Sequence, residues 1–308
     1  MSRTAGGKRK LQHIKTLENI EGDPTHHLAG SFLPQTWIVV PISSLKMLLV
    51  VVACWANWQI LAPYVGQSIA NPFAPLLFIS HRIPTSSEDD PRYQKGWLDL
   101  AFITYYVIFW SFVRQTITIH LCHPCARYFG IKKAAKLDRF GEQGYALIYF
   151  AIMAAWGVRV MSQLPTWWYR TEYFWIDYPH WEMKPELKRY YLMQMAYWLQ
   201  QFIVLALGLE KPRKDFYELI AHHLVTLWLV GTPRWSYLVN LTLIGNAVYL
   251  SMDLPDAWLA FSKLLNYLQM ERTKVAVFAL FLCIWSYFRH WLNWVILWSV
   301  WFEFDLIP

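Results

Sequence analysis

Residues 47–65 read MLLVVVACWANWQILAPYV, an apolar run interrupted by Asn57 and Gln59. At about 1.5 Å per residue, a helix of this length crosses the roughly 30 Å hydrocarbon core of a bilayer. A strand of a membrane β-barrel would alternate apolar and polar residues, and this run does not. We therefore predict a transmembrane helix at about 46–65. The residues before it are polar, so we expect an uncleaved span rather than a secretory signal.

Further apolar stretches follow along the chain, and each predicts a membrane-spanning helix. Their approximate ranges are 97–119, 145–162, 189–208, 217–232, 236–262 and 274–301. The sequence thus predicts an all-α integral membrane protein, a polytopic bundle of about seven transmembrane helices. The expected regions are a cytosolic polar tail at 1–45, a first helix with its lumenal loop at 46–96, a six-helix domain at 97–301 and a short C-terminal end at 302–308.

The composition agrees with this class. Of 308 residues, 56% are hydrophobic and 16% are charged, against about 25% charged in soluble proteins. The formal net charge is +7, but the basic residues lie in short loops between apolar runs, which argues against a nucleic-acid partner. Three of the four cysteines lie in or beside spans, which is not a disulfide framework.

The same basic residues predict the orientation. If the tail is cytosolic, seven spans place the loops at 120–144, 209–216 and 263–273 on the cytosolic side, and these loops are the basic ones. The loops at 66–96 and 163–188 carry mixed charge and fall on the other side. Positive charge collects on the cytosolic side of membrane proteins, so this orientation is self-consistent.

Two adjacent histidines interrupt the span predicted at 217–232. His222 and His223 lie in an apolar run, with Glu218 one turn before His222 and Thr226 one turn after it. An ionisable group at the bilayer centre costs about 2.5–3.5 kcal/mol on insertion scales, which marks it as a candidate for function. The tail contains a second histidine pair at 26–27, to which we assign no role.

Two carboxylates occupy the next predicted span. Asp253 and Asp256 are three residues apart, so they face one side of a helix, and Pro255 weakens that helix locally. Imidazole takes a proton near neutral pH and is itself open to acylation. A carboxylate holds an imidazole in one tautomer and stabilises the imidazolium. The combination suits acyl transfer.

Other interpretations of the histidine pair stay open at this point. The imidazoles are alternatively core residues bonded to neighbouring helices, or members of a proton relay in a transporter. Zinc binding is a further alternative, although neighbouring side chains lie about 100° apart on a helix, which makes shared ligation awkward. The segment 120–125 (HLCHPC) has part of a metal-ligand spacing without a second half, so we predict no metal site.

Several longer segments of this sequence together resemble a known motif. These are 213–218 (RKDFYE), 222–226 (HHLVT), 252–256 (MDLPD) and 262–268 (SKLLNYL). The combination resembles the Lag motif of ceramide synthases, which belong to the TLC-domain superfamily. Residues 140–143 (FGEQ) and 175–180 (WIDYPH) extend the resemblance to roughly 95–300. The pair Met252-Asp253 is similar to the fungal longevity-assurance branch.

The resemblance implies a fold, a place and a reaction. We expect six helices at 97–301 to form a barrel-like core around a central cavity, in the endoplasmic reticulum membrane. The implied reaction is N-acylation of a sphingoid base, dihydrosphingosine or phytosphingosine, with fatty acyl-CoA as co-substrate and no cofactor. Implied partners are membrane lipids, a small single-span regulatory subunit and a second synthase unit in a homo- or heterodimer. The family's usual further lumenal loop and final span, which influence acyl-chain length, are not found here, so acyl preference stays open.

The resemblance also implies roles for individual residues. The candidate catalytic residues are His222, His223, Asp253 and Asp256. The candidate substrate-binding residues are Glu218, Thr226, Asn246, Arg289, His290, Arg213 and Lys214. The last two, in a basic loop, either attract CoA phosphates or are topology signals. Asp253 is expected to orient a histidine.

Two catalytic routes fit these residues. One histidine acts as general base while the amine attacks the thioester, or one histidine is first acylated and the amine resolves the acyl-imidazole. We favour the second, because a pair lets one imidazole carry the acyl group while the other moves protons. Non-catalytic relatives that handle lipids or associate with the translocon, and self-protection paralogues from toxin gene clusters, remain alternatives.

Overall fold

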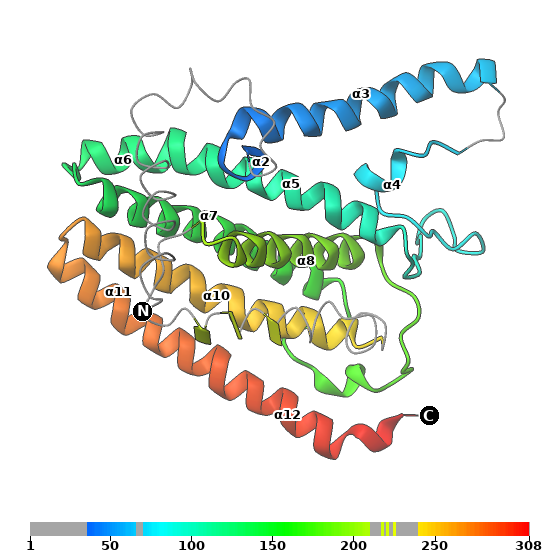
Figure 1. Cartoon of the computed structure of the whole chain (residues 1–308). Helices are drawn as coiled ribbons and strands as arrows, with labels where there is room; N and C mark the ends of the chain where they lie inside the picture. Colours follow the sequence, from blue (N-terminus) through cyan, green and yellow to red (C-terminus); the bar gives the residue numbers. More distant parts are fainter. Residues whose placement is uncertain are drawn as a thin grey trace, which may run out of the picture. The chain divides into compact units, whose positions relative to one another are not determined.

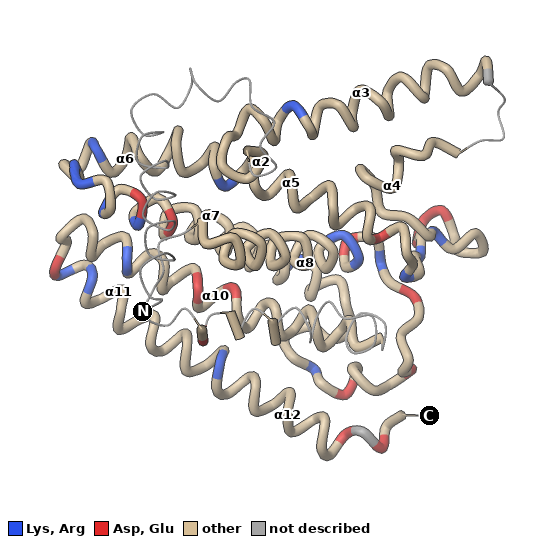
Figure 2. The backbone as a smooth tube through the Cα atoms, viewed as in Figure 1, with Lys and Arg blue, Asp and Glu red and all other residues tan. Residues whose placement is uncertain are grey.

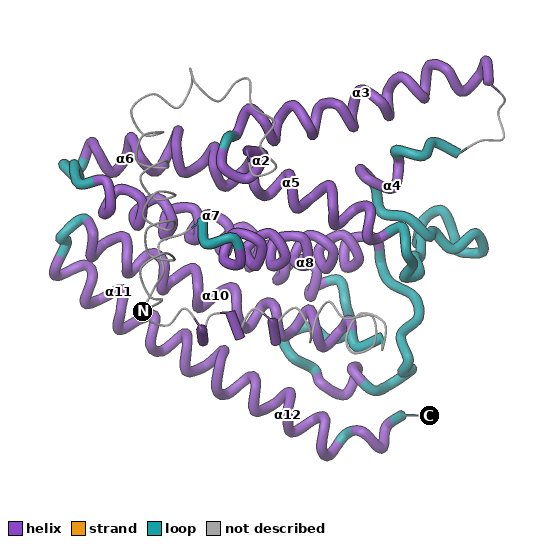
Figure 3. The backbone as a smooth tube through the Cα atoms, in the orientation of Figure 1, coloured by secondary structure: helices purple, strands orange, loops and turns teal. Residues whose placement is uncertain are grey.

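The computed structural model describes residues 36–65, 70–209, 217–218, 220–221, 224–225 and 240–307. From Trp37 onward, the described residues belong to one compact unit. The described residues form helices and loops and contain no β-strand (Figure 3). Their only strand-like pairings are two isolated bridges, Arg82 with Tyr93 and Tyr93 with Met183. The prediction of an all-α protein is confirmed.

The long helices fall close to the predicted spans. They are α3 (Pro41–Val65), α5 (Asp99–Ile117), α7 (Ala134–Ser162), α8 (Pro185–Ala206), α10 (Thr242–Tyr267), α11 (Glu271–Trp285) and α12 (Asn293–Phe302). The short ones are α2 (Thr36–Val39), α4 (Ala74–Leu77), α6 (His123–Tyr128), η2 (Thr171–Phe174) and η4 (Phe304–Leu306). The π-helical turns η1 (Thr118–Cys122) and η3 (Ser286–Leu292) join α5 to α6 and α11 to α12 without a break.

Within the described residues, four helical stretches are long and apolar enough to cross a membrane. They are Pro41–Tyr64, Asp99–Tyr128, Ala134–Ser162 and Glu271–Phe302. Each overlaps a predicted span, which supports the assignment to a membrane. Helices α8 and α10 also coincide with predicted spans, but polar residues interrupt their apolar character. The span predicted at 217–232 lies outside the described residues except for a few positions, so the total of seven stays a prediction.

Several predicted boundaries were wrong. The first helix begins at Pro41 rather than near 46, and α7 begins at Ala134 rather than near 145. The basic loop expected at 120–144 is largely helical, since α6 extends to Tyr128 and only a short connection precedes α7. The residues added to α7 include lysine, arginine and glutamate, which are good helix formers, and α3 begins with Pro41, a residue favoured at the first helical position. Hydropathy therefore marks where a helix meets the membrane surface, not where the helix ends.

Helix α10 lies at the centre of the packing. It packs most extensively on α7 and also contacts α11, while α5 packs on α8 and α3 on α5 (Figure 1). Buried aromatic and aliphatic side chains from α5, α7, α8 and α10 form the main core. Helix α3 differs, because most of its apolar side chains are exposed. Exposed apolar surface on a helix of spanning length is the property of a lipid-facing helix.

Charged residues gather mainly in loops and near helix ends (Figure 2). Among the described exceptions are Asp253 and Asp256 near the middle of α10, and Arg289 in η3. The segment 120–125 lies in η1 and α6, and no cluster of three or more His, Cys, Asp or Glu side chains within the described ranges is arranged to hold a metal ion. Cys122 is instead buried in a small apolar cluster that includes Phe140 of α7.

A buried ion pair ties the start of α5 to the start of α8. Lys188 Nζ lies 2.8 Å from Asp99 Oδ1, and the two side chains are 0% and 3% exposed. Lys188 Nζ also donates to the carbonyl oxygens of Ser80 at 2.8 Å and Gln94 at 2.6 Å. Asp99 Oδ2 accepts the backbone N–H of Gly96 at 3.0 Å. Both charges are thus compensated, and the loop before α5 is fixed to the bundle.

Candidate functional site

Asp253 lies on the buried face of α10. Its neighbours along that face are Asn246, Leu250 and Ala257, whose spacing of three to four residues repeats once per helical turn. The Asp253 side chain is 0% exposed. A carboxylate is buried so completely only when other groups satisfy it, so its partners define the site.

At two glycines, tyrosine side chains of α8 reach the backbones of α7 and α10. A Cβ at Gly157 of α7 would lie 2.8 Å from the Tyr190 hydroxyl oxygen, and a Cβ at Gly245 of α10 would lie 2.5 Å from that of Tyr191. Both distances are shorter than any ordinary contact. The two glycines therefore make room for these tyrosines of α8, of which Tyr190 contacts Asp253.

One oxygen of Asp253 is bound by neutral donors from α8. Gln194 Nε2 donates to Asp253 Oδ2 at 2.5 Å, and the Tyr190 hydroxyl lies 3.5 Å from the same oxygen. Gln194 Nε2 also donates to the Tyr190 hydroxyl oxygen at 3.1 Å. On the other side of the amide, Gln194 Oε1 accepts the hydroxyl of Tyr149 from α7 at 2.7 Å. The network joins three helices without a cation.

The other oxygen of Asp253 is different. Oδ1 is buried and has no hydrogen-bond partner within the described residues. The same is true of both amide atoms of Asn246, two turns earlier on the same face of α10. Buried polar atoms are nearly always paired in proteins. These atoms therefore mark the place where a further polar group, from a ligand or another side chain, is expected.

Asp256 has a cationic partner. Arg289 Nη2 lies 2.8 Å from Asp256 Oδ1, with about a quarter of each side chain exposed. The same nitrogen lies 3.4 Å from the Met252 carbonyl oxygen, and Asn293 Nδ2 donates to the Arg289 carbonyl at 3.0 Å. Arg289 belongs to the π-helical turn η3, and single π turns occur often at functional sites. The charge of Asp256 is thus compensated by η3.

Aromatic rings surround the Asp253 network. Tyr149 stacks on Tyr197 with a centroid distance of 3.3 Å, and Trp110 meets Tyr149 edge to face at 5.1 Å. Tyr190 is similarly edge to face with Trp156 and Tyr249. Such packing keeps water away from the carboxylate and strengthens every electrostatic interaction around it.

The structure brings some of the predicted site residues together and separates others. Asp253, Asp256, Asn246 and Arg289 lie on or against α10. His290 is exposed, with its ring 4.3 Å from that of Trp285, and Glu218 is exposed without a contact to this group. The other candidates lie outside the described residues: His222, His223, Thr226, Arg213 and Lys214.

Sequence reasoning missed Gln194, Tyr149 and Tyr190. Gln194 carried a usable signal, because an amide in the middle of the span predicted at 189–208 is as exceptional as a carboxylate there. The two tyrosines carried none, since this sequence has 18 tyrosines and tyrosine is common in membrane helices.

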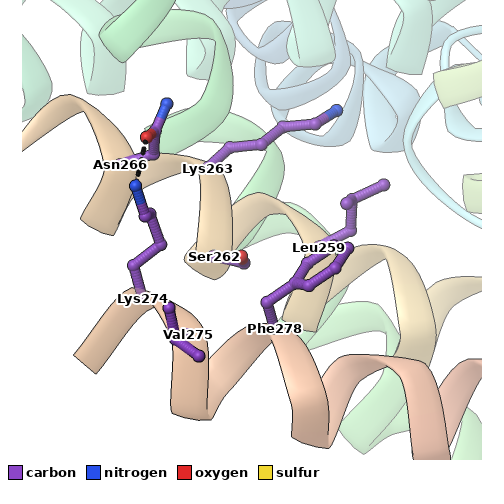
Figure 4. Close-up of a pocket in the computed structure, with 7 residues that line it drawn as sticks. All are labelled: Leu259, Ser262, Lys263, Asn266, Lys274, Val275 and Phe278. Atoms are coloured by element: carbon purple, nitrogen blue, oxygen red, sulfur yellow. Dashed lines mark hydrogen bonds between the residues drawn. The ribbon is translucent and has the colours of Figure 1, made fainter. Parts of the chain in front are cut away.

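A separate hollow of about 350 Å³ lies where α10 turns into α11. Figure 4 shows its lining of Leu259, Ser262, Lys263, Asn266, Lys274, Val275 and Phe278. Lys274 Nζ donates to Asn266 Oδ1 at 3.1 Å and pairs with Glu271 at 2.6 Å. The hollow is polar on one side and apolar on the other. It lies at the helix ends, at the side predicted to be cytosolic.

A protein-family comparison identifies residues 139–308 as a TLC domain. The matched region contains most of α7 and all of α8, α10, α11 and α12. It therefore includes Gln194, Asp253, Asp256 and Arg289, as well as the histidine pair.

Known proteins resemble the chain over a longer range. It is 41% identical over 269 residues to sphingosine N-acyltransferase lac1 of Schizosaccharomyces pombe, covering 87% of this chain and 64% of that protein. It is 42% identical over 217 residues to the sphingosine N-acyltransferase-like protein FUM17 of Gibberella moniliformis, covering 70% and 55%. It is 32% identical over 288 residues to sphingosine N-acyltransferase lag1 of Schizosaccharomyces pombe, covering 92% and 68%. The chain thus spans between 55% and 68% of the length of these curated relatives.

Proposed function

The chain belongs to the TLC-domain family, and on this premise we propose that it is a ceramide synthase, an acyltransferase that joins a fatty acyl group from acyl-CoA to the amine of a sphingoid base. The names of the relatives support the reaction. The structural observation that carries the proposal is Asp253, a buried carboxylate with one oxygen held by neutral donors and the other without a described partner.

The proposed chemistry needs a base and an anion. The amine of the sphingoid base is protonated at neutral pH and gives up one proton before it attacks. Its nitrogen then bonds to the thioester carbonyl carbon while the C–S bond breaks. An imidazole of His222 or His223 takes the second amine proton and returns it to the CoA sulfur. Asp253 stabilises the imidazolium formed in between, as a carboxylate does beside a catalytic histidine.

We favour the covalent form of this reaction. One imidazole nitrogen bonds to the acyl carbon as the C–S bond breaks, and the N–H proton lost by that imidazole goes to the departing CoA sulfur. The neutral amine then bonds to the acyl carbon as the bond to the imidazole breaks, and the second histidine transfers one amine proton to the departing imidazole. The aromatic surroundings of Asp253 support either route, because a reactive acyl-imidazole needs protection from water.

The proposal extends to the bundle. Helices α8 and α10 cross the membrane together with the four apolar stretches, as parts of about seven spans of which six surround a central cavity. Support comes from the burial of their polar residues, since Gln194, Asp253 and Asn246 face the protein interior rather than lipid. The proposed location is the endoplasmic reticulum membrane. The proposed partners are membrane lipids, a small single-span subunit and a second synthase unit.

A direct assay tests the activity. The full chain, reconstituted in lipid vesicles, is given labelled dihydrosphingosine and acyl-CoA, and ceramide is measured by mass spectrometry. We expect His222→Ala and His223→Ala each to reduce the rate by about 10²- to 10⁴-fold. The pair at 26–27 is the matched control, because substituting the same dipeptide in the tail should leave the rate unchanged. Movement of labelled base without amide formation would contradict the proposal and favour a transporter.

A second assay separates the two routes. The protein is mixed with acyl-CoA alone, quenched rapidly and digested, and peptides containing residues 222–223 are searched for an added acyl mass. The covalent route predicts an adduct on one histidine that disappears when dihydrosphingosine is added. Turnover without an adduct at any time point would assign the histidines to general-base catalysis only.

A further inference from the structure

We propose that Gln194 is the positioning residue of Asp253: its amide, fixed by Tyr149, holds one carboxylate oxygen and leaves the other for the reactant that carries the proton. This inference rests on the proposed function and deepens it, because it assigns a task to a residue of α8 outside the histidine and aspartate motif.

The orientation of the amide is determined by its surroundings. A glutamine side chain has an acceptor end and a donor end, whereas an ionised carboxylate only accepts. The Tyr149 hydroxyl donates to Gln194 Oε1 at 2.7 Å, so the NH₂ group faces α10. One N–H of this group bonds to Asp253 and the other to the Tyr190 hydroxyl. Reversing the amide would set Oε1 against the carboxylate, so Tyr149 selects the productive orientation.

The choice of a neutral donor matters for the charge. An arginine at this position would fix the carboxylate equally well but would also cancel its charge. Arg289, which could have served, pairs with Asp256 at 2.8 Å. Within the described residues no salt bridge involves Asp253. No described cation thus offsets a negative charge on Asp253, which leaves this carboxylate available to a cation formed in the reaction, the imidazolium or the protonated amine.

The geometry has a further consequence for Oδ1. A carboxylate rotates about its Cβ–Cγ bond, and two neutral hydrogen-bond donors at Oδ2 restrict that rotation. The position of the other oxygen, Oδ1, is then fixed as well. Catalytic groups have to be held within about 0.5 Å of their productive position. Gln194 is 0% exposed and its three hydrogen bonds are made inside the protein. The orientation of the Gln194 amide is thus fixed by protein groups and does not depend on water.

Substitution of Gln194 tests the inference, with Gln200 as a matched control. Gln194→Leu removes the donor, and we expect kcat to fall by about 10- to 100-fold with little change in KM, as for loss of a hydrogen bond to a charged group. Gln200 lies on the same helix, is 1% exposed and has no hydrogen-bond partner for either amide atom within the described residues. Gln200→Leu should leave kcat unchanged. Equal effects of the two substitutions would overturn the proposal.

A second variant gives a readout that general damage to folding would not produce. In Gln194→Glu, a protonated carboxyl group donates to Asp253 as the amide does, while an ionised one repels it. The rate should thus approach that of wild type at low pH and fall further below it as pH rises. Gln194→Leu should show no such recovery. A pH profile of Gln194→Glu parallel to that of wild type would contradict the positioning role of Gln194.

Tyr149→Phe tests the source of the orientation. It removes the hydroxyl and keeps the ring, so we expect a smaller loss of kcat than for Gln194→Leu. Because both act through one amide, the double variant should be no slower than Gln194→Leu alone. Additive losses would show that Tyr149 acts independently of Gln194.

An activity-independent measurement separates this inference from the proposed function. The infrared difference between wild type and Asp253→Asn reports the carboxylate of Asp253, and Gln194→Leu should shift its bands while Gln200→Leu should not. If wild type makes no ceramide but the shift occurs, the positioning role stands and the proposed reaction fails. If ceramide forms and neither kcat nor the bands respond to Gln194→Leu, the positioning role fails alone.

Discussion

Asp99 and Asp253 are both buried carboxylates of this protein, but their surroundings differ in one respect. Asp99 faces Lys188 at 2.8 Å and also accepts a backbone N–H, so its charge is compensated. Asp253 is held by the neutral groups Gln194 and Tyr190, and its second oxygen has no described partner. A buried charge costs several kcal/mol unless it is paired. Of the two buried carboxylates among the described residues, Asp253 is the one without a cationic partner, which marks it as the candidate for function.

Structural and functional acidic residues of this membrane protein differ in charge compensation rather than in burial. Burial alone does not distinguish them, since the Asp99 and Asp253 side chains are 3% and 0% exposed. Compensation does. We therefore expect changes at the Asp99 pair to reduce stability, and changes at the Asp253 network to reduce turnover.

The largest effect is expected for Asp253→Asn. The change keeps the shape but removes the anion, and its amide is free to turn an NH₂ group toward the position of Oδ1. We expect ceramide formation to fall by about 10²- to 10⁴-fold. The midpoint of thermal unfolding in detergent should change little, because the donors on Oδ2 can bond to the new carbonyl oxygen. A large loss of stability with normal turnover per folded molecule would show that Asp253 has a structural role like that of Asp99.

The opposite outcome is expected for Lys188→Met. It leaves Asp99 buried without its cation, and we expect a loss of about 3–5 kcal/mol in the free energy of unfolding. Equilibrium unfolding in mixed micelles measures this, and turnover per folded molecule should stay close to wild type. Adding Asp99→Leu removes the orphaned charge and should restore much of the stability. A Lys188→Met protein as stable as wild type would show that the pair does not fix the loop before α5.

Lys95 makes the stability of the same end of the bundle depend on pH. It precedes α5 and donates to Asn240 Oδ1 at 2.5 Å. Burial first, and the nearby charge of Lys188 second, lower the pKa of Lys95 to about 7. The unfolded chain holds this proton up to a pKa of about 10.4, so it binds more protons than the folded protein between these values. Stability should therefore rise above pH 7, by up to about 2 kcal/mol at pH 9 after allowance for partial exposure.

Thermal unfolding at pH 6 to 9 checks this sign. The Lys95→Met variant should lose most of the pH dependence over that range, whereas Lys274→Met, in α11, is a control that should keep it. A wild-type midpoint that falls as pH rises would mean that the ammonium is stabilised by the fold rather than opposed by it.

The smallest effect is expected for Arg289→Met. Its partner Asp256 is about a quarter exposed, so hydration replaces much of the lost interaction. We expect at most about 1 kcal/mol of destabilisation. Turnover should fall less than for Asp253→Asn, because the described contacts of Arg289 are with Asp256 and the Met252 carbonyl oxygen rather than with the Asp253 carboxylate. A loss of turnover as large as that of Asp253→Asn would place Arg289 in direct contact with substrate.

Much of the fold was predictable because membrane spans are a local property. The run at 47–65 predicts a helix from its length and apolarity alone, and the structure contains that helix as α3. Helix α7 begins earlier than predicted because charged residues continue it beyond the apolar segment, whereas α3 begins earlier at Pro41, a residue favoured at the first position of a helix. Helices α8 and α10 do not meet the apolar criterion for a membrane span, because each contains polar residues that face the protein interior.

The site was predictable only in part. The carboxylates of Asp253 and Asp256 were expected on one face because they are three residues apart. That spacing also turns them about 60° apart around a helix of 3.6 residues per turn. The difference is enough for Asp253 to face α8 while Asp256 faces η3.

The sequence by itself determined that this is a helical membrane protein, where most of its spans lie, and that two aspartates in one span are exceptional. Those conclusions need only the residues themselves and the thickness of a bilayer. The tertiary structure decided which aspartate is neutralised by Arg289 and which is held by Gln194. Hydrogen bonds and charge compensation join helices that lie far apart in the chain, and no local pattern of residues specifies which side chains will meet.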